Sequence, residues 1–264
     1  MPVSAFDMIT NGILLSKRKA AVSSYTEVGV NTNDGAYLVF PATLPATQHF
    51  LAFSSYRTNS DFRGSILGLE NVISSDGWRA DDTNSDGLAR PEIDFLINGD
   101  RDSKFISTAN YAIGDKMCLL ISGTISGSVA TSKVVIWDET SGAAASVFTT
   151  NSAASANSYD WNRYSATPPA LFASAGGQRS ADLMNYRFAF WDANDLGGAP
   201  PNIDDGTVQD RFFNGSTGVT VDPAVSHAAY GVPSYELHGP ASNYNNGTNF
   251  GTGNDWTADG PSFS

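Results

Sequence analysis

The sequence predicts an all-β domain, built as a sandwich of two antiparallel sheets. Eight short apolar or alternating segments recur between residues 36 and 191, and turn-forming residues separate them. The chain contains 25 glycines and only 16% charged residues, a composition typical of short strands joined by many turns. Parallel strands need long crossover connections, which this pattern lacks, so we expect neighbouring strands to pair antiparallel.

Each expected strand is a short run of apolar or alternating residues bounded by turn residues. The expected strands comprise residues 36–40, 49–56, 65–69, 93–97, 117–125, 133–137, 144–148 and 186–191. In the last strand aromatic residues alternate with Arg187, Ala189 and Trp191, which predicts that both faces of this strand are covered. We expect Trp137 and Trp191 to pack in the core.

One short helix is expected near residue 204. Asp204 and Asp205 are suitable N-caps, the apolar residues that follow are three or four positions apart, and Asn214-Gly215 marks the end. From about residue 214 turn-forming residues dominate, so the sequence predicts an irregular C-terminal tail that wraps the sandwich or contacts a neighbour.

The length of 264 residues suits one large domain, which we expect to span residues 26–264. Residues 1–25 show no clear period and are interpreted as an N-terminal arm. Lys17, Arg18 and Lys19 follow the apolar residues of this arm instead of preceding them, so it is not a secretory signal. No apolar run approaches the roughly 20 residues that a membrane span needs.

The net charge of −12 and the pI near 4.4 make nucleic acid and anionic membranes unfavourable partners, because Lys and Arg carry the attraction to both. The Asp and Glu side chains that give this negative charge could hold a cation.

Cys118 is the only cysteine and lies in an apolar run, so we expect a small core residue and no intramolecular disulfide. A single cysteine without a disulfide partner fits a protein made in a reducing cytoplasm.

Three groups of aromatic residues stand beside polar and charged residues in segments expected to be loops. A pyranose offers an apolar face to an aromatic ring and hydroxyls to Asp, Asn and Arg, so this mixture is typical of a sugar site. The alternative is that these aromatics pack in the core or at an interface. The candidate carbohydrate-binding residues are Tyr56, Arg57, Trp78, Tyr159, Asp160, Trp161, Asn162, Arg163 and Tyr164.

The segment from Asp82 to Gly87 resembles a calcium loop. It places Asp82, Asn84 and Asp86 at alternate positions with a glycine at the sixth, so that a tight turn could direct their oxygens at one hard cation. The twelfth position is Ile93, where such loops have a bidentate Glu. The alternative is a solvated turn rich in Asp and Asn.

Catalysis is not expected. Glu92-Ile-Asp94 resembles the start of the E-x-D-x-E signature of jelly-roll glycosidases, but Leu96 occupies the third acidic position. Retaining hydrolysis needs two carboxyl groups about 5 Å apart across the scissile bond. The three histidines lack metal-ligand spacing and are interpreted as structural, and no phosphate-binding or nucleophile motif appears.

The order of segments resembles the concanavalin A-like and laminin-G-like lectins. The strands at 36–40 and 49–56 are followed by a central pair at 114–122 and 133–138, and then by a closing strand at 185–195 and a short helix at 203–213. The resemblance covers roughly residues 35–213, and it implies a jelly-roll sandwich.

The segment Asn249-Phe-Gly-Thr-Gly-Asn-Asp-Trp-Thr-Ala-Asp-Gly260 is similar to the N-x-G-T-G-x-D-F/W-T-x-x-G ending of jelly-roll proteins from tailed bacteriophages and gene transfer agents. This resemblance implies a virion surface protein, such as a head spike, head fibre or tail adhesin, that is made in the bacterial cytoplasm. Its expected partners are host cell-surface polysaccharide, other virion proteins reached through residues 1–25 or the C-terminal tail, and further copies of itself. Two alternatives stay open at this point: a capsid decoration or minor structural protein without sugar binding, and a polysaccharide-degrading glycosidase.

Overall fold

A computed structural model of the chain describes most of the strands and the whole C-terminal segment. The described residues are 25–33, 35–41, 48–57, 64–68, 77–83, 90–97, 100–105, 115–126, 129–139, 141–152, 169–173 and 183–264. None of the helices in these ranges is long and apolar enough to cross a membrane.

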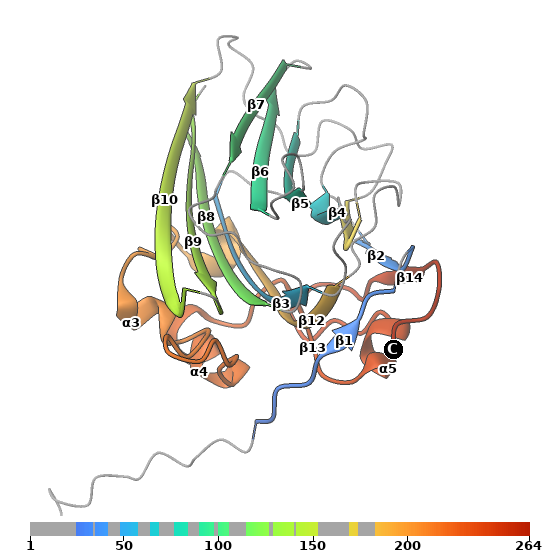
Figure 1. Cartoon of the computed structure of the whole chain (residues 1–264). Helices are drawn as coiled ribbons and strands as arrows, with labels where there is room; N and C mark the ends of the chain where they lie inside the picture. Colours follow the sequence, from blue (N-terminus) through green and yellow to red (C-terminus); the bar gives the residue numbers. More distant parts are fainter. Residues whose placement is uncertain are drawn as a thin grey trace, which may run out of the picture.

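The described strands form two sheets that face each other (Figure 1). In sheet A the strand order is β1 (Val30–Asn31), β12 (Leu183–Asp192), β3 (Gln48–Arg57), β8 (Lys116–Ser126), β9 (Val129–Asp138) and β10 (Ala143–Ser152), and β13 (Tyr235–His238) also pairs with β12. In sheet B the order is β14 (Thr257–Asp259), β2 (Tyr37–Val39), β11 (Ala170–Leu171), β4 (Gly64–Gly68), β5 (Gly77–Thr83), β6 (Arg90–Ile97) and β7 (Asp100–Phe105).

Every pairing between these strands is antiparallel. The predicted fold class, an antiparallel two-sheet jelly-roll sandwich, is therefore confirmed. All eight strands expected from the sequence are present, as β2, β3, β4, β6, β8, β9, β10 and β12.

The sequence did not indicate β5 and β7. Their sequences, GWRADDT and DRDSKF, are rich in charged residues and lack an apolar alternation. The ladder hydrogen bonds that hold them come from the backbone, and β6 pairs with β5 on one side and β7 on the other. The position of these strands therefore depends on their neighbours in the sheet more than on their own sequence.

An aromatic core joins the two sheets at the β2 edge of sheet B. The ring of Phe40, which follows β2, lies edge-on to Tyr235 of β13 at 4.9 Å between centroids and to Trp256 at 5.8 Å. Phe188 of β12 also contacts Phe40 and Trp256. These four side chains are at most 7% exposed, and burial of each large apolar side chain contributes about 1.5–3 kcal/mol.

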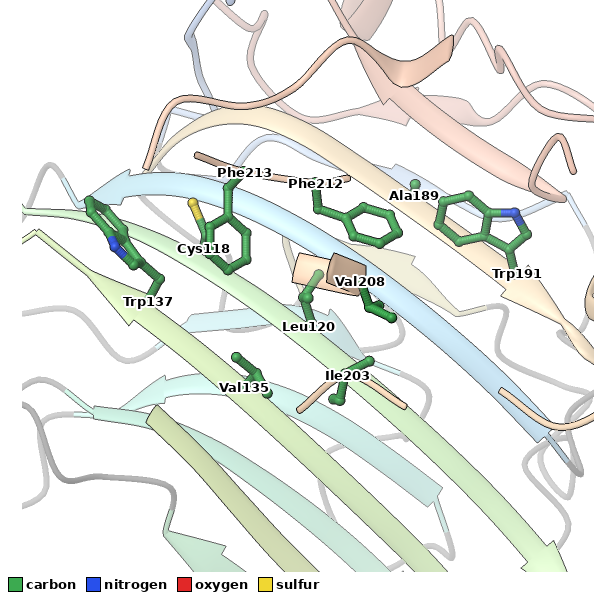
Figure 2. Close-up of a cluster of buried hydrophobic side chains, with 10 residues drawn as sticks. All are labelled: Cys118, Leu120, Val135, Trp137, Ala189, Trp191, Ile203, Val208, Phe212 and Phe213. Atoms are coloured by element: carbon green, nitrogen blue, oxygen red, sulfur yellow. The ribbon is translucent and has the colours of Figure 1, made fainter. Parts of the chain in front are cut away.

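A second apolar cluster covers the other face of sheet A, which we call the outer face. Side chains from β8, β9 and β12 meet side chains of the C-terminal segment there, as Figure 2 shows. The cluster comprises Cys118, Leu120, Val135, Trp137, Ala189, Trp191, Ile203, Val208, Phe212 and Phe213. The predicted core positions of Cys118, Trp137 and Trp191 are confirmed, since each is at most 1% exposed.

The two tryptophans of this cluster also fasten the C-terminal segment through hydrogen bonds. Trp137 Nε1 donates to the carbonyl oxygen of Gly215 at 2.8 Å, and Trp191 Nε1 donates to that of Gly231 at 3.0 Å. Figure 1 shows the helices of this segment, α3 (Gly206–Gln209) and α4 (Pro223–Tyr230), outside the space between the sheets. The part of the outer face formed by Cys118, Leu120, Val135, Trp137, Ala189 and Trp191 is thus covered by the C-terminal segment.

The helix expected near residue 204 is α3. Asp205 is its N-cap and accepts a hydrogen bond from the backbone N–H of Thr207 at 2.9 Å. Regular helix ends at Gln209, before the expected end at Asn214, and turns follow. Two further short helices, α2 (Ala193–Leu196) and α5 (Ala241–Asn245), were not expected.

The expectation of an irregular tail from about residue 214 is corrected. This segment forms α4, β13, α5 and β14, and its two strands add to sheet A and sheet B respectively. Asp222 caps α4 and Pro223 begins it, which is a helix start that the sequence did display. The two strands have four and three residues, too few to give a period without their partners.

Strand order and connection lengths define two ends of the sandwich. Six residues join Arg57 of β3 to Gly64 of β4, and Gly64 pairs with Asp82, so these residues share one end, which we call the Arg57 end. β10 finishes at Ser152, opposite Val129, at the other end of sheet A. The chain next enters sheet B at β11, where Ala170 pairs with Gly68 at the far end of β4. We call this second end the Ser152 end.

Candidate functional site

The strand order separates the candidate carbohydrate-binding residues into two groups. Tyr56 and Arg57 are the last residues of β3, at the Arg57 end, where Tyr56 pairs with Lys116 and Met184. Trp78 is the second residue of β5, opposite Phe95, at the Ser152 end. Trp78 therefore lies in a strand and not in the loop expected for it. These candidates do not belong to one site.

Residues 159–164 lie outside the described residues, but both ends of the segment that contains them are described. The segment leaves β10 at Ser152 and returns at Pro169, before β11. Both of these positions are at the Ser152 end. The connectivity therefore brings both attachment points of this segment and the start of β5 to the same end of the sandwich.

Of the predicted calcium ligands, only Asp82 falls within a described strand. It lies in β5, opposite Pro91, and the β5–β6 ladder continues to Thr83 and Arg90 at the Arg57 end. Asn84 and Asp86 lie outside the described residues. No group of three or more His, Cys, Asp or Glu side chains with the geometry of a metal site occurs in the described ranges. Calcium binding stays a prediction.

The glycosidase-like carboxylates are on β6 in sheet B. Glu92 pairs with Asp81, and Asp94 pairs with Arg79. Leu96, at the third position of the signature, pairs with Gly77 and Arg101. An apolar residue thus occupies the strand position where the glycosidase signature has its third carboxylate. The expectation that the protein is not an enzyme stays a prediction.

A cluster of charged side chains, which the sequence did not indicate as a group, is buried on the outer face of sheet A. Arg187 of β12 is paired with Glu236 of β13: its Nη2 and Nε donate to Glu236 Oε1 at 2.7 and 2.9 Å. The other carboxylate oxygen, Oε2, is 2.6 Å from Nε2 of His227 on α4. The two charged residues are only 2% and 0% exposed. We call Arg187, Ser226, His227 and Glu236 the outer-face charged cluster.

The carboxyl group of Glu236 is held ionised despite its burial. Burial alone would raise its pKa, but the hydrogen bond from His227 and the positive charge of Arg187 together lower it below the ordinary value of 4.5. The cluster thus joins α4 to two strands of sheet A by a buried ion pair.

Ser226, His227 and Glu236 combine the residue types of a catalytic triad, but their hydrogen bonds do not suit nucleophilic catalysis. Ser226 Oγ donates to the carbonyl oxygen of Pro223 at 2.9 Å and accepts from Arg187 Nη2 at 2.7 Å. It is fully buried, and His227 bonds Glu236, not Ser226. These contacts stabilise the attachment of α4.

Aromatic residues border the charged cluster. The ring of His238 on β13 stacks on Phe250 at 4.4 Å and meets the ring of Tyr25 edge-on at 6.3 Å. Burial raises the pKa of Tyr25 to about 12 and lowers the pKa of His238 below its ordinary value of 6.5. The interpretation of His227 and His238 as structural residues agrees with these contacts.

Acid is expected to destabilise the fold in two steps. Burial lowers the pKa of His238 in the folded protein, so protonation of this residue favours the unfolded chain. The stability associated with neutral His238 is therefore complete above about pH 6.5 and declines as the pH falls below that value. The contribution of Glu236 is complete above about pH 4.5 and is lost as the pH falls through its lowered folded pKa. Thermal unfolding measured from pH 8 to about pH 2 checks both steps. In His238→Phe the upper step should disappear, and its persistence would contradict this assignment.

The segment 249–260, which resembles the ending of phage jelly-roll proteins, is anchored to the fold through Asn249, Trp256 and Asp259. The side chain of Asn249 accepts hydrogen bonds from the backbone of Glu236 and Gly251 at 2.9 Å and donates to the carbonyl oxygens of Ser234 and Gly253 at 3.0 and 2.9 Å. Trp256 enters the core between the sheets, and Asp259 accepts from Tyr37 Oη at 2.8 Å. These roles explain the pattern of Asn, Gly, Asp and Trp by packing alone.

Solved structures with a similar fold support the architecture. A "putative carbohydrate binding protein" from Bacteroides ovatus aligns with 90% of this chain, with a TM-score of 0.51 and 12% identity, and the alignment covers 59% of that protein. The heptameric SAP-like pentraxin from Limulus polyphemus gives a TM-score of 0.41 and 13% identity over 63% of this chain and 76% of its own. No protein-family model and no curated protein sequence matches. At these identities the likeness to the Bacteroides ovatus protein, which has the higher TM-score of the two, shows the fold alone.

Proposed function

We propose that this protein binds polysaccharide, without cleaving it, through a site at the Ser152 end of the sandwich. The observation that carries the proposal is the strand order, which brings Trp78 and both attachment points of residues 153–168 to this end.

The chemistry of the segment attached at this end supports sugar recognition. Tyr159, Trp161 and Tyr164 offer aromatic faces to pyranose rings, while Asp160, Asn162 and Arg163 offer hydrogen bonds to hydroxyl groups. Each residue type is common in sites that bind an amphipathic ligand, and their interleaving within six positions places both functions in one segment. The lectin-like fold of the solved relatives is consistent with this role.

The biological setting that we propose is the surface of a tailed-phage or gene-transfer-agent particle, where the protein would attach to host cell-surface polysaccharide. Support comes from the resemblance of residues 249–260 to phage jelly-roll proteins. Several copies on one particle would convert weak binding by each site into firm attachment. Calcium, if it binds at Asp82, would act at the Arg57 end.

Binding to a panel of bacterial polysaccharides on an array tests this proposal. We expect Trp161→Ala and Trp78→Ala each to weaken binding by roughly fivefold or more, because each removes about 1–3 kcal/mol of stacking and burial. Tyr56→Ala is the matched control, since it removes an equally suitable aromatic side chain at the Arg57 end and should leave binding unchanged.

The possible outcomes separate the competing functions. Binding that is lost in Tyr56→Ala or on chelation of calcium would place the site at the Arg57 end and contradict the proposal. No binding to any polysaccharide would favour a decoration protein of the particle. Release of reducing ends that is lost in Glu92→Gln would favour a glycosidase.

A further inference from the structure

The exposed side of helix α4 is apolar. Pro223, Ser226 and the ring of Tyr230 pack inward, and His227 is partly buried in the charged cluster. Ala224, Val225, Ala228 and Ala229 are exposed. A surface helix ordinarily turns polar side chains to solvent, so an exposed side made of alanine and valine is unusual for a helix that faces only water.

The apolar character extends beyond both ends of α4. Val219 and Val232 flank the helix in sequence and are 47% and 43% exposed, and Val225 within it is 43% exposed. They account for three of the five large apolar residues that are exposed in the described part of the chain; the others are Val28 and Phe250. Exposed apolar surface concentrated on one short segment indicates a contact site.

The negative charge of the C-terminal segment favours a positively charged binding partner for this face. Residues 193–264 contain seven Asp and one Glu but only one Arg, a formal net charge of −7. Asp204, Asp205 and Asp210 beside α3 are exposed. A second copy of this segment would carry the same charge and be repelled, whereas a basic segment with apolar residues would be attracted.

Residues 1–24 of the chain have this chemistry. They include Lys17, Arg18 and Lys19 with Asp7 as the only acidic residue, and they contain Ile9 and the run Ile13-Leu14-Leu15. They lead directly into Tyr25, whose ring packs on His238 and whose phenol is affected by the charge of Asp222, the N-cap of α4. An extended chain of this length reaches about 80 Å, while α4 is about 12 Å long, so reach is not limiting.

We propose that residues 1–24 dock on the exposed apolar face of α4 in the same molecule. The apolar residues of the segment would cover Val225 and its neighbours, and its basic residues would face the acidic surroundings of α3 and α4. This inference does not depend on the proposed sugar binding, which takes place at another part of the sandwich.

Limited trypsin digestion of the full chain tests the docking. A docked segment should be cleaved after Lys17, Arg18 and Lys19 at least tenfold more slowly than a synthetic peptide of residues 1–24, because a protease needs an accessible, extended substrate. Val225→Lys places a positive charge against the basic residues of the segment and should restore cleavage after residues 17–19 to the rate of the peptide. High salt should accelerate cleavage of the parent by weakening the charge attraction.

Ala143→Lys is the matched control, since Ala143 is an exposed alanine of β10 and its substitution should leave the rate of cleavage after residues 17–19 unchanged. Thermal unfolding verifies that the variants fold, and Ala228→Lys serves as the second variant if Val225→Lys does not fold. Cleavage of the parent at the peptide rate would overturn the proposal. Protection that increases with protein concentration would also overturn it, because the segment would then dock on another molecule.

Discussion

The Glu236→Ala variant is expected to lose about 3–5 kcal/mol of unfolding free energy. The substitution leaves the guanidinium of Arg187, 2% exposed, without its counter-charge, and it removes the acceptor that holds His227. Removal of one partner of a buried ion pair costs far more than the pair itself contributes, because the remaining charge stays desolvated. Urea denaturation at pH 7.5, followed by tryptophan fluorescence, measures the loss.

A double variant distinguishes this cause from the loss of packing volume. Arg187→Met/Glu236→Leu removes both charges and keeps most of the apolar volume, so it should recover at least half of the stability lost in Glu236→Ala. If the double variant is as unstable as the sum of the two single substitutions, the buried charge is not the cause. If Glu236→Ala is as stable as the parent protein, the ion pair makes no net contribution to the free energy of unfolding.

Gly218→Ala is the second variant with a large expected effect, a loss of about 3–5 kcal/mol. Gly218 has a φ of +62°, and a Cβ atom at this position would overlap the indole ring of Trp137. Its carbonyl oxygen also accepts from Cys118 Sγ at 3.3 Å, which keeps the backbone against sheet A. The substitution should lower the thermal midpoint and separate the C-terminal segment from β9.

Gly142→Ala separates steric overlap from backbone strain. Gly142 has almost the same φ, +60°, but nothing lies within 4 Å of the position of its Cβ. Its substitution should therefore cost only the strain of a left-handed residue, about 1–2 kcal/mol. Equal losses in the two variants would mean that the contact with Trp137 is unimportant.

The fold could be predicted from the sequence wherever a strand carries its own apolar pattern. β8 and β12 are examples, since their alternation and length are sufficient to identify them. β13 could not be predicted, because its four residues include Glu236 and His238 and resemble a polar turn. Glu236 is tolerated in a buried strand only because Arg187 of β12 and His227 of α4 bind its carboxylate. These contacts join residues distant in sequence, so no local pattern could predict them.

The candidate site was predictable in its chemistry but not in its arrangement. Tyr56 and Trp78 have the same side-chain properties in the sequence, and only the pairing of β3 and β5 with their neighbours assigns them to opposite ends. The charged cluster offered one local signal, the single Arg187 among the apolar residues of its strand. Its partners are 39 and 49 positions away, beyond any periodicity.

The two strands contributed by the C-terminal segment have a consequence for biosynthesis. β13 extends one sheet and β14 the other, and the backbone of Asn31 exchanges hydrogen bonds with Ser264 at 2.7 and 3.2 Å. A nascent chain that has not yet emerged beyond residue 235 lacks both strands and Trp256, which joins the layers, so neither sheet is complete until residues 235–259 have emerged. Both sheets should therefore be completed late and slowly, as is usual when contacts distant in sequence must form together.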